Sequence, residues 1–350
     1  MAKLLNRRRF ILDSSLVGFG FSVLAAHRTI ALPIQTKLEN LLVDNNGDRI
    51  KTRAQWEEKR KTIKRRWLDY LGVLKPNPEK PILKVLKEDY PEGVVRQYVG
   101  YEGEPGITVN GYLLKPQKIR QTLPGVVVFH STGDKEMHRI AGLGEGEMDD
   151  FGLKLAQQGY VVFCPECFLW HNKNGRTFEE QTLLFQKRHP RSKGMAKMLF
   201  DAQRAVDVLE TLDEVDTDRI ASLGHSLGGK EALYLGAFDE RVKVVVCNEA
   251  GIGIDLSNWE ENWYLGNEIV DFGYQHHEVL VLNAPKPFLL IGGDSADGEK
   301  SRPYIEAVKP VYKLYGKERN IVLKNHGAGH YSNPVAEEWM YEWIKKHLEK

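Results

Sequence analysis

The sequence predicts an α/β protein, with an open and mostly parallel central sheet that carries helices on both faces. Two observations support this prediction. From residue 125 onward, short apolar runs alternate with helical patterns, as expected for strands that are joined by crossover helices. In addition, a G-x-S-x-G segment at residues 224–228 lies between an apolar run and a helical pattern, where a sharp strand-to-helix turn would fit.

The strands are recognised from apolar runs of strand length. Residues 94–101 and 107–115 alternate in polarity like an antiparallel pair, and the continuous apolar run 125–130 is typical of a buried central strand. Further strands are expected at 160–164, 219–223, 242–247, 287–291 and 320–324. Helical spacing of apolar residues predicts helices at 53–74, 148–158, 195–212, 304–315 and 334–348.

The chain divides into three parts, of which the first comprises residues 1–31. Residues 32–90 form an N-terminal helical segment that we expect to pack on the core, and residues 91–350 form the α/β domain. Two stretches of that domain, near 165–193 and 251–280, lack a clear period and follow strands that end on the expected catalytic side. We expect them to line a substrate cleft with aromatic residues; the alternative is that these aromatics fill a satellite core. In 251–280 they are Trp259, Trp263, Tyr264, Phe272 and Tyr274.

Residues 1–31 resemble a twin-arginine export signal. Consecutive arginines at 7–9 precede a mainly apolar stretch that ends at Ala26, which is too short and too polar for a membrane span. Cleavage would follow Ala26 or Ala31, leaving no stable span in the mature protein. We therefore expect a periplasmic or secreted protein; the alternative is an N-terminal helix of the folded chain.

Charge and cysteine content exclude several functions. The formal net charge is +1, so no nucleic-acid partner is indicated. Three cysteines are too few for a disulfide scaffold, and Cys164 and Cys167 are interpreted as ordinary strand-end cysteines or a strained disulfide. The adjacent His276 and His277 lack the spacing of a zinc site, so we predict neither a metal nor a cofactor.

Ser226, at the centre of the glycine-rich segment, is the candidate nucleophile. A serine hydroxyl needs a histidine base, and the histidine needs a carboxylate to fix its tautomer. Both should follow the serine in the chain. The predicted base is His330, whose loop contains two glycines and precedes the last helix; His326, nearer the strand end, is the alternative.

Three carboxylates compete for the role of catalytic acid. Asp297 follows the strand at 287–291 and is the preferred candidate. Glu249 is the alternative, because it ends the preceding strand, and Asp294 is the third possibility. The oxyanion would be bound by backbone N–H groups of Leu227, which follows the nucleophile, and of Thr132, which follows the strand ending at His130.

The chain resembles the α/β-hydrolases in three features: the turn around Ser226, the order of the strands and the loop of His330. Within the α/β-hydrolases, it resembles the acetyl xylan esterase and dienelactone hydrolase-like group. Segments 102–106, 111–114 and 284–287 share that pattern. The chain is also similar to glucuronoyl esterases, which carry a lysine four residues after the nucleophile, matched by Lys230, and often a catalytic glutamate where Glu249 stands. The resemblance implies that Lys230 contacts the sugar. Glucuronoyl esterases have an arginine where this chain has Leu227.

Together these features predict an exported serine carboxylesterase that acts on a carbohydrate-linked ester through an acyl-enzyme. Its partner would be a small-molecule or polysaccharide ester. Two alternatives remain on the same fold: a serine peptidase of the prolyl-oligopeptidase type, and a non-catalytic binding protein. Fold alone does not decide between them.

Overall fold

A nine-stranded sheet forms the centre of the computed structural model, which describes residues 38–133, 135–144, 149–171 and 175–349. The predicted export signal, residues 1–31, lies outside these residues. The strands are β1 (Lys84–Asp89), β2 (Val94–Glu102), β3 (Thr108–Pro116), β4 (Leu123–Phe129), β5 (Val161–Pro165), β6 (Val215–His225), β7 (Val242–Asn248), β8 (Phe288–Gly292) and β9 (Ile321–Asn325).

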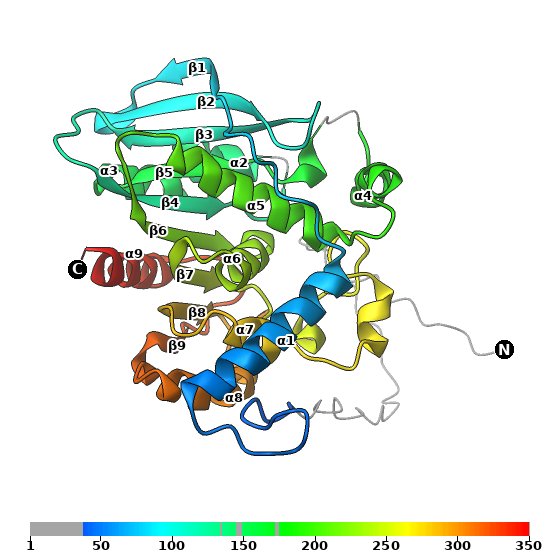
Figure 1. The fold of residues 1–350 in the computed structure, drawn as a ribbon. Helices are drawn as coiled ribbons and strands as arrows, with labels where there is room; N and C mark the ends of the chain where they lie inside the picture. Colours follow the sequence, from blue (N-terminus) through cyan, green and yellow to red (C-terminus); the bar gives the residue numbers. More distant parts are fainter. Residues whose placement is uncertain (1–37, 134, 145–148, 172–174, 350) are drawn as a thin grey trace, which may run out of the picture. The chain divides into compact units, whose positions relative to one another are not determined.

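The sheet is mostly parallel, as predicted. Its order is β1-β2-β3-β5-β4-β6-β7-β8-β9, from the top to the bottom of Figure 1. Strands β1, β2, β3 and β5 pair antiparallel, whereas the pairs from β5–β4 to β8–β9 are parallel. The carboxyl ends of β4, β6, β7 and β8 therefore meet at one edge of the sheet, and the loops that leave this edge can share a site.

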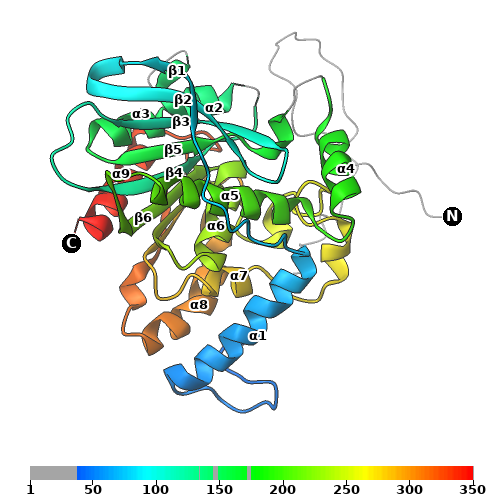
Figure 2. The same ribbon diagram turned by 45° about the horizontal axis from the view of Figure 1, so that its top comes forward.

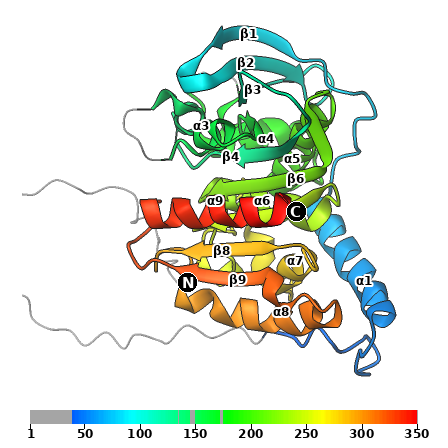
Figure 3. The same ribbon diagram turned by 90° about the vertical axis from the view of Figure 1, so that its left-hand side faces the viewer.

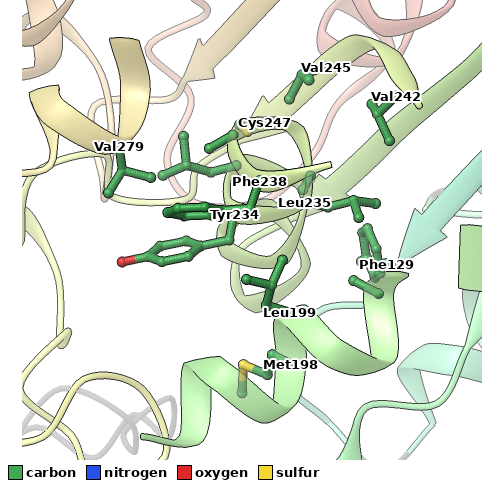
Figure 4. Close-up of a cluster of buried hydrophobic side chains, with 14 of the residues drawn as sticks. Phe129, Met198, Leu199, Tyr234, Leu235, Phe238, Val242, Val245, Cys247 and Val279 are labelled. Carbon is green, nitrogen blue, oxygen red and sulfur yellow. The ribbon is translucent and has the colours of Figure 1, made fainter. Parts of the chain in front are cut away.

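Helices cover both faces because neighbouring strand residues point in opposite directions. On one face, Val127 and Phe129 belong to a cluster with α5 (Gly194–Glu210) and α6 (Leu227–Phe238). On the other, Val126 and Val128 belong to a cluster with α3 (Phe151–Gln157) and α9 (Pro334–Leu348). Figure 4 shows side chains of α5, α6 and β7 meeting in the first cluster. In Figure 3, α9 lies in front of the sheet, across the position of β7.

Helix α1 (Arg53–Leu71) is held at both ends by local signals. Thr52 and Gln55 form a capping box at its start, and Gly72 ends it in a left-handed conformation with φ of 61°. A Cβ atom at Gly72 would lie 2.1 Å from the carbonyl oxygen of Arg191, so only glycine fits. The helix thus ends three residues earlier than its apolar pattern suggested.

One face of α1 packs on α7 (His277–Val281), and the two helices lie side by side in Figures 1 and 2. Trp56, Ile63 and Trp67 of this face are buried. The indole N–H of Trp67 donates to the carboxylate of Glu278 at 2.9 Å. The N-terminal helix is thus joined to the domain by a buried polar contact as well as by apolar packing.

Sequence patterns missed β1 and α4 (Phe178–Arg188). Strand β1 is charged and largely exposed, so it lacks the alternation that marks a half-buried strand. Helix α4 lies in the segment 165–193, where no helix was expected. It begins with a capping box in which Thr177 and Glu180 bind each other's backbone N–H groups, and that T-x-x-E spacing was a usable signal. The remaining helices are α2 (Glu136–His138) and α8 (Arg302–Leu314).

Cys164 and Cys167 are both unpaired and buried, so the disulfide interpretation is wrong for this structure. Cys164 lies in the cluster with α3 and α9, whereas Cys167 lies beyond the end of β5 in the cluster with α5 and α6. The two thiols therefore belong to opposite faces of the sheet. Among the described residues, no helix is both long and apolar enough to cross a membrane.

We predict that Trp67→Phe lowers the free energy of unfolding by about 1–3 kcal/mol, because a buried oxygen of Glu278 loses its donor. The matched control is Trp343→Phe, since the buried indole N–H of Trp343 has no hydrogen-bond partner among the described residues. Urea unfolding of both variants gives the comparison. Equal losses would mean that ring packing, and not the hydrogen bond, holds α1 in place.

Candidate active site

Ser226 stands on a sharp turn between β6 and α6. Its φ and ψ are 57° and −116°, an unfavourable conformation for a residue with a side chain. A Cβ atom at Gly224 would lie 2.0 Å from the carbonyl oxygen of Gly228, and one at Gly228 would lie 2.3 Å from that of Phe129. Both glycines are therefore required by close backbone approaches, as the motif suggested.

The turn brings Ser226 to the imidazole of His330. The Oγ atom of Ser226 lies 2.9 Å from Nε2 of His330, and Nδ1 of the same ring lies 3.2 Å from Oε2 of Glu249. These three side chains come from the ends of β6 and β7 and from the loop between β9 and α9. The arrangement is the nucleophile, base and carboxylate series that acyl transfer requires.

The carboxylate of Glu249 is buried and well supplied with donors. It accepts hydrogen bonds from the backbone N–H groups of Gly293, Ala296 and Asp297. Burial raises the pKa of Glu249, but the hydrogen bonds from His330 and from these N–H groups outweigh that effect, so the pKa is below its usual value of 4.5. An ionised carboxylate therefore faces His330 at neutral pH.

Asp297, the preferred acid in the sequence analysis, does not face His330. Its carboxylate is fully buried and accepts from the backbone N–H groups of Gly251 (2.6 Å) and Ile252 (2.9 Å) and from the hydroxyl of Ser301 (2.7 Å). Burial raises its pKa, with a further contribution from the charge of Glu249. The geometry thus favours Glu249 as the partner of the histidine.

The other two rivals also point elsewhere. Asp294 is exposed and accepts from the side-chain amide of Asn325 at 2.7 Å. The imidazole of His326 accepts at Nδ1 from the backbone N–H of Ala328 and contacts the amide of Asn333 at 2.9 Å. Neither side chain has a hydrogen bond to Ser226 among the described residues, because Asp294 is bound to the end of β9 and His326 to its own loop.

The sequence analysis missed the contact made by His225. Its ring Nε2 lies 2.7 Å from the backbone carbonyl oxygen of His330, a distance at which a neutral ring can donate. Burial, assisted by the nearby His330, lowers the pKa of His225 to about 4. His225 therefore holds the loop of His330 as a neutral group. Its place directly before the nucleophile was the only available signal.

The two predicted oxyanion donors are the backbone N–H groups of Leu227 and Thr132. Leu227 is the first residue of α6, where backbone N–H groups have no partner within the helix. Its side chain is buried in the core, so it offers no polar group to the site. Thr132 follows β4. The last carbonyl oxygen of β4 approaches Gly228 of the nucleophile elbow, which is the turn formed by residues 224–228. Their role in binding an oxyanion stays a prediction.

Lys230 is buried rather than exposed on its helix. Its ammonium donates to the carbonyl oxygen of Ala250 (2.9 Å) and the hydroxyl of Ser257 (2.6 Å), and it lies 4.2 Å from the ring centroid of Trp259. Burial lowers its pKa to about 7, against the attraction of nearby carboxylates that include Asp297. Trp259 is itself fully buried, so it belongs to the core. This agrees with the alternative that the aromatic residues fill a core, and not with the expectation that they line a cleft.

The described residues also enclose a cavity of about 450 Å³, which neither Ser226, His330 nor Glu249 lines. Its walls include Ile107 after β2, Phe168 and His171 after β5, and Arg188 of α4. Part of the segment 165–193 lines this cavity, whereas its expected role in a substrate cleft stays a prediction. Among the described residues, no group of three or more His, Cys, Asp or Glu side chains could hold a metal ion.

Comparisons with known proteins agree with this fold. The family model of the dienelactone hydrolase family matches residues 109–248, which span β3 to β7 and include the elbow. A solved glucuronoyl esterase from Solibacter usitatus superposes with a TM-score of 0.72 over 89% of this chain and 97% of its own, at 18% identity. The chain thus has the α/β-hydrolase fold, and its central part matches the dienelactone hydrolase family. The resemblance stated from the sequence is confirmed.

Curated relatives also match by sequence. YtaP of Bacillus subtilis, a protein named as a hydrolase, is 25% identical over 275 residues, which cover 75% of this chain and 89% of YtaP. The 4-O-methyl-glucuronoyl methylesterase of Phanerochaete carnosa is 30% identical over 166 residues, which cover 38% of this chain and 39% of that enzyme. The similarity to that esterase is thus confined to part of each chain.

We predict that this α/β-hydrolase loses stability as the pH falls from 6.5 towards 4, partly through His225. The unfolded histidine takes up a proton near pH 6.5, whereas the folded one does so only near pH 4, so the unfolded state is favoured in between. The loss from this group is about 3 kcal/mol below pH 4.

His225→Gln should therefore flatten the pH dependence of the free energy of unfolding over this range, measured by urea titration at several pH values. Val246→Ala serves as control, because it removes buried apolar volume and no titratable group, so it should lower stability equally at each pH. An unchanged slope in His225→Gln would contradict the assignment of a neutral buried imidazole.

Proposed function

We propose that this protein is a serine esterase that cleaves carbohydrate-linked esters with Ser226, His330 and Glu249. The observation that carries the proposal is the pair of contacts at the elbow, 2.9 Å from serine to histidine and 3.2 Å from histidine to glutamate. The names of the structural and sequence relatives, among them glucuronoyl esterases, support an ester as the substrate.

The reaction follows from the order of these contacts. His330 Nε2 takes the proton of Ser226 while Oγ attacks the ester carbonyl, and backbone N–H groups of Leu227 and Thr132 would stabilise the resulting oxyanion. The alcohol leaves with the proton from His330. Water, deprotonated by the same imidazole, then attacks the acyl group; the bond to Oγ of Ser226 breaks, the acid is released, and His330 returns the proton to Oγ. Throughout, the ionised Glu249 stabilises the positive charge that forms on the histidine.

We predict that Glu249→Gln lowers kcat on p-nitrophenyl acetate by about 10³- to 10⁴-fold, because the amide cannot stabilise the charged imidazole. Ser226→Ala should abolish the burst of nitrophenol and labelling by a fluorophosphonate. Asp294→Asn is the matched control, since this carboxylate binds Asn325 and not His330, and its activity should stay within about threefold of the wild type. Full activity of Ser226→Ala would refute the proposal.

We predict that the methyl ester of glucuronic acid is cleaved with a kcat/KM at least about tenfold above that of methyl cyclohexanecarboxylate, which has the same bond and no hydroxyl groups. Acetylated xylan and cyclohexyl acetate form the corresponding pair for an acetyl ester. A preference within either pair identifies which part of the carbohydrate ester is recognised. Equal rates within both pairs would indicate a general carboxylesterase.

We also propose that the protein works outside the cytoplasm. The arginines at 7–9 and the apolar stretch after them support this proposal. Replacing all three arginines by lysine keeps the charge but removes the twin-arginine pattern. In fractionated bacterial cells, this variant should stay in the cytoplasm while the wild type is exported; equal distribution would contradict export by this signal.

A further inference from the structure

The ammonium of Lys230 is occupied by protein groups, although the chemistry above assigns it no role. Only 3% of the residue is exposed. Its nitrogen donates to Ala250 and Ser257, and the rings of Trp259 and Tyr264 lie 4.2 and 5.0 Å away. An ammonium has three donors, so two hydrogen bonds and two aromatic faces account for most of its interactions. The group is directed at the loop after β7.

Asp297 binds the same loop from the opposite side. The carbonyl oxygen of Ala250 accepts from Lys230, while the N–H of Gly251 donates to Asp297 at 2.6 Å. These two backbone groups belong to one peptide unit. When Lys230 is protonated and Asp297 is ionised, the dipole of this peptide lies between a cation at its oxygen end and an anion at its nitrogen end. This is the favourable orientation, and both hydrogen bonds are then charge-assisted.

This peptide unit directly follows Glu249. Glu249 and Gly251 have φ values of 50° and 69°, so the chain reverses sharply here, and the glutamate is held in a region unfavourable for a residue with a side chain. Its carboxylate binds backbone N–H groups of residues 293–297, and Asp297 of that segment binds N–H groups after Glu249. The two loops thus fix each other.

We propose that Lys230 and Asp297 are positioning residues that hold the peptide between Ala250 and Gly251 and so keep the carboxylate of Glu249 against His330. The inference rests on the proposed esterase function. A positioning role of Lys230 differs from a sugar-binding role. In the positioning role, Lys230 acts through Glu249, so its effect does not require a sugar in the substrate.

The charges around the pair are few. Glu260 and the buried His276 interact with Lys230, and Glu249 and Tyr304 interact with Asp297. Glu260 lies on the loop between β7 and α7, whereas Glu249 is the residue being positioned. Removal of either member leaves the other charge buried without its counterpart, and the loop must then rearrange to hydrate it or pair it.

The first test measures kcat and KM of Lys230→Met and Asp297→Asn on p-nitrophenyl acetate, which contains no sugar. Positioning predicts that kcat falls about 10- to 100-fold in each variant, because the imidazole loses an aligned carboxylate, while KM changes less than about threefold. Wild-type kcat on this ester, with a loss confined to the glucuronate ester, would overturn the proposal in favour of a sugar contact.

The second test repeats both substitutions in the Glu249→Gln background. If the pair acts through Glu249, each substitution should reduce the remaining kcat by less than about threefold, since the carboxylate it positions is gone. Losses as large as in the wild-type background would show that the pair acts independently of Glu249 and would overturn the proposal.

Lys286→Met is the matched control. Lys286 is also nearly buried and donates to two backbone carbonyl oxygens, those of Gly236 and Asp239, but at the far end of α6. The Lys286→Met variant should lose stability while keeping kcat.

If Lys230→Met does not fold, Lys230→Gln replaces it, because the shorter amide removes the charge; wild-type kcat in a folded Lys230→Gln overturns the proposal. An inactive wild type would instead refute the esterase function itself.

Discussion

The close approach of three strand ends at the start of α6 is the constraint on which the candidate site depends. The N–H of Ser226 donates to the carbonyl oxygen of Asn248 at 2.8 Å, so the elbow is bonded to the end of β7. On its other side, Gly228 comes against the last carbonyl oxygen of β4. A side chain at Gly224 or Gly228 would push these segments apart. The turn that presents Ser226 therefore requires glycine two residues before it and two residues after it.

This packing also explains why the buried charges lie where they do. Helix α6 starts so close to the sheet that Lys230, one turn after Ser226, reaches the backbone beyond β7. The loop there has left the strand ladder, and its polar groups need other partners. Lys230, Asp297 and the indole of Trp259 supply them for residues 250–252. A hydrogen-bond network of this kind favours a single conformation of the loop that carries Glu249.

The fold could be predicted largely from the sequence because its signals are local. The buried strands are continuous apolar runs, and α5 shows regular spacing in its buried residues, so both were recognised. Strand β1 was not predicted, because it is charged and exposed and its place in the sheet depends on pairing with β2. The aromatic residues after β7 were assigned to a cleft, but Trp259 is core, because a pattern of aromatic residues does not tell which side the chain buries.

The sequence by itself singled out Ser226 as the candidate nucleophile, and it preferred His330, the histidine that contacts Ser226 in the structure, over His326. Ser226 is specified by glycines within two residues of it, and His330 by a flexible loop between the last strand and the last helix. Only the tertiary structure decided between Glu249 and Asp297 as the carboxylate that faces the histidine. Both follow strands that end at the same edge of the sheet, so strand order cannot separate them. Which carboxylate faces His330 depends on the hydrogen bonds that each one accepts from backbone N–H groups of the other loop. These hydrogen bonds join segments more than forty residues apart.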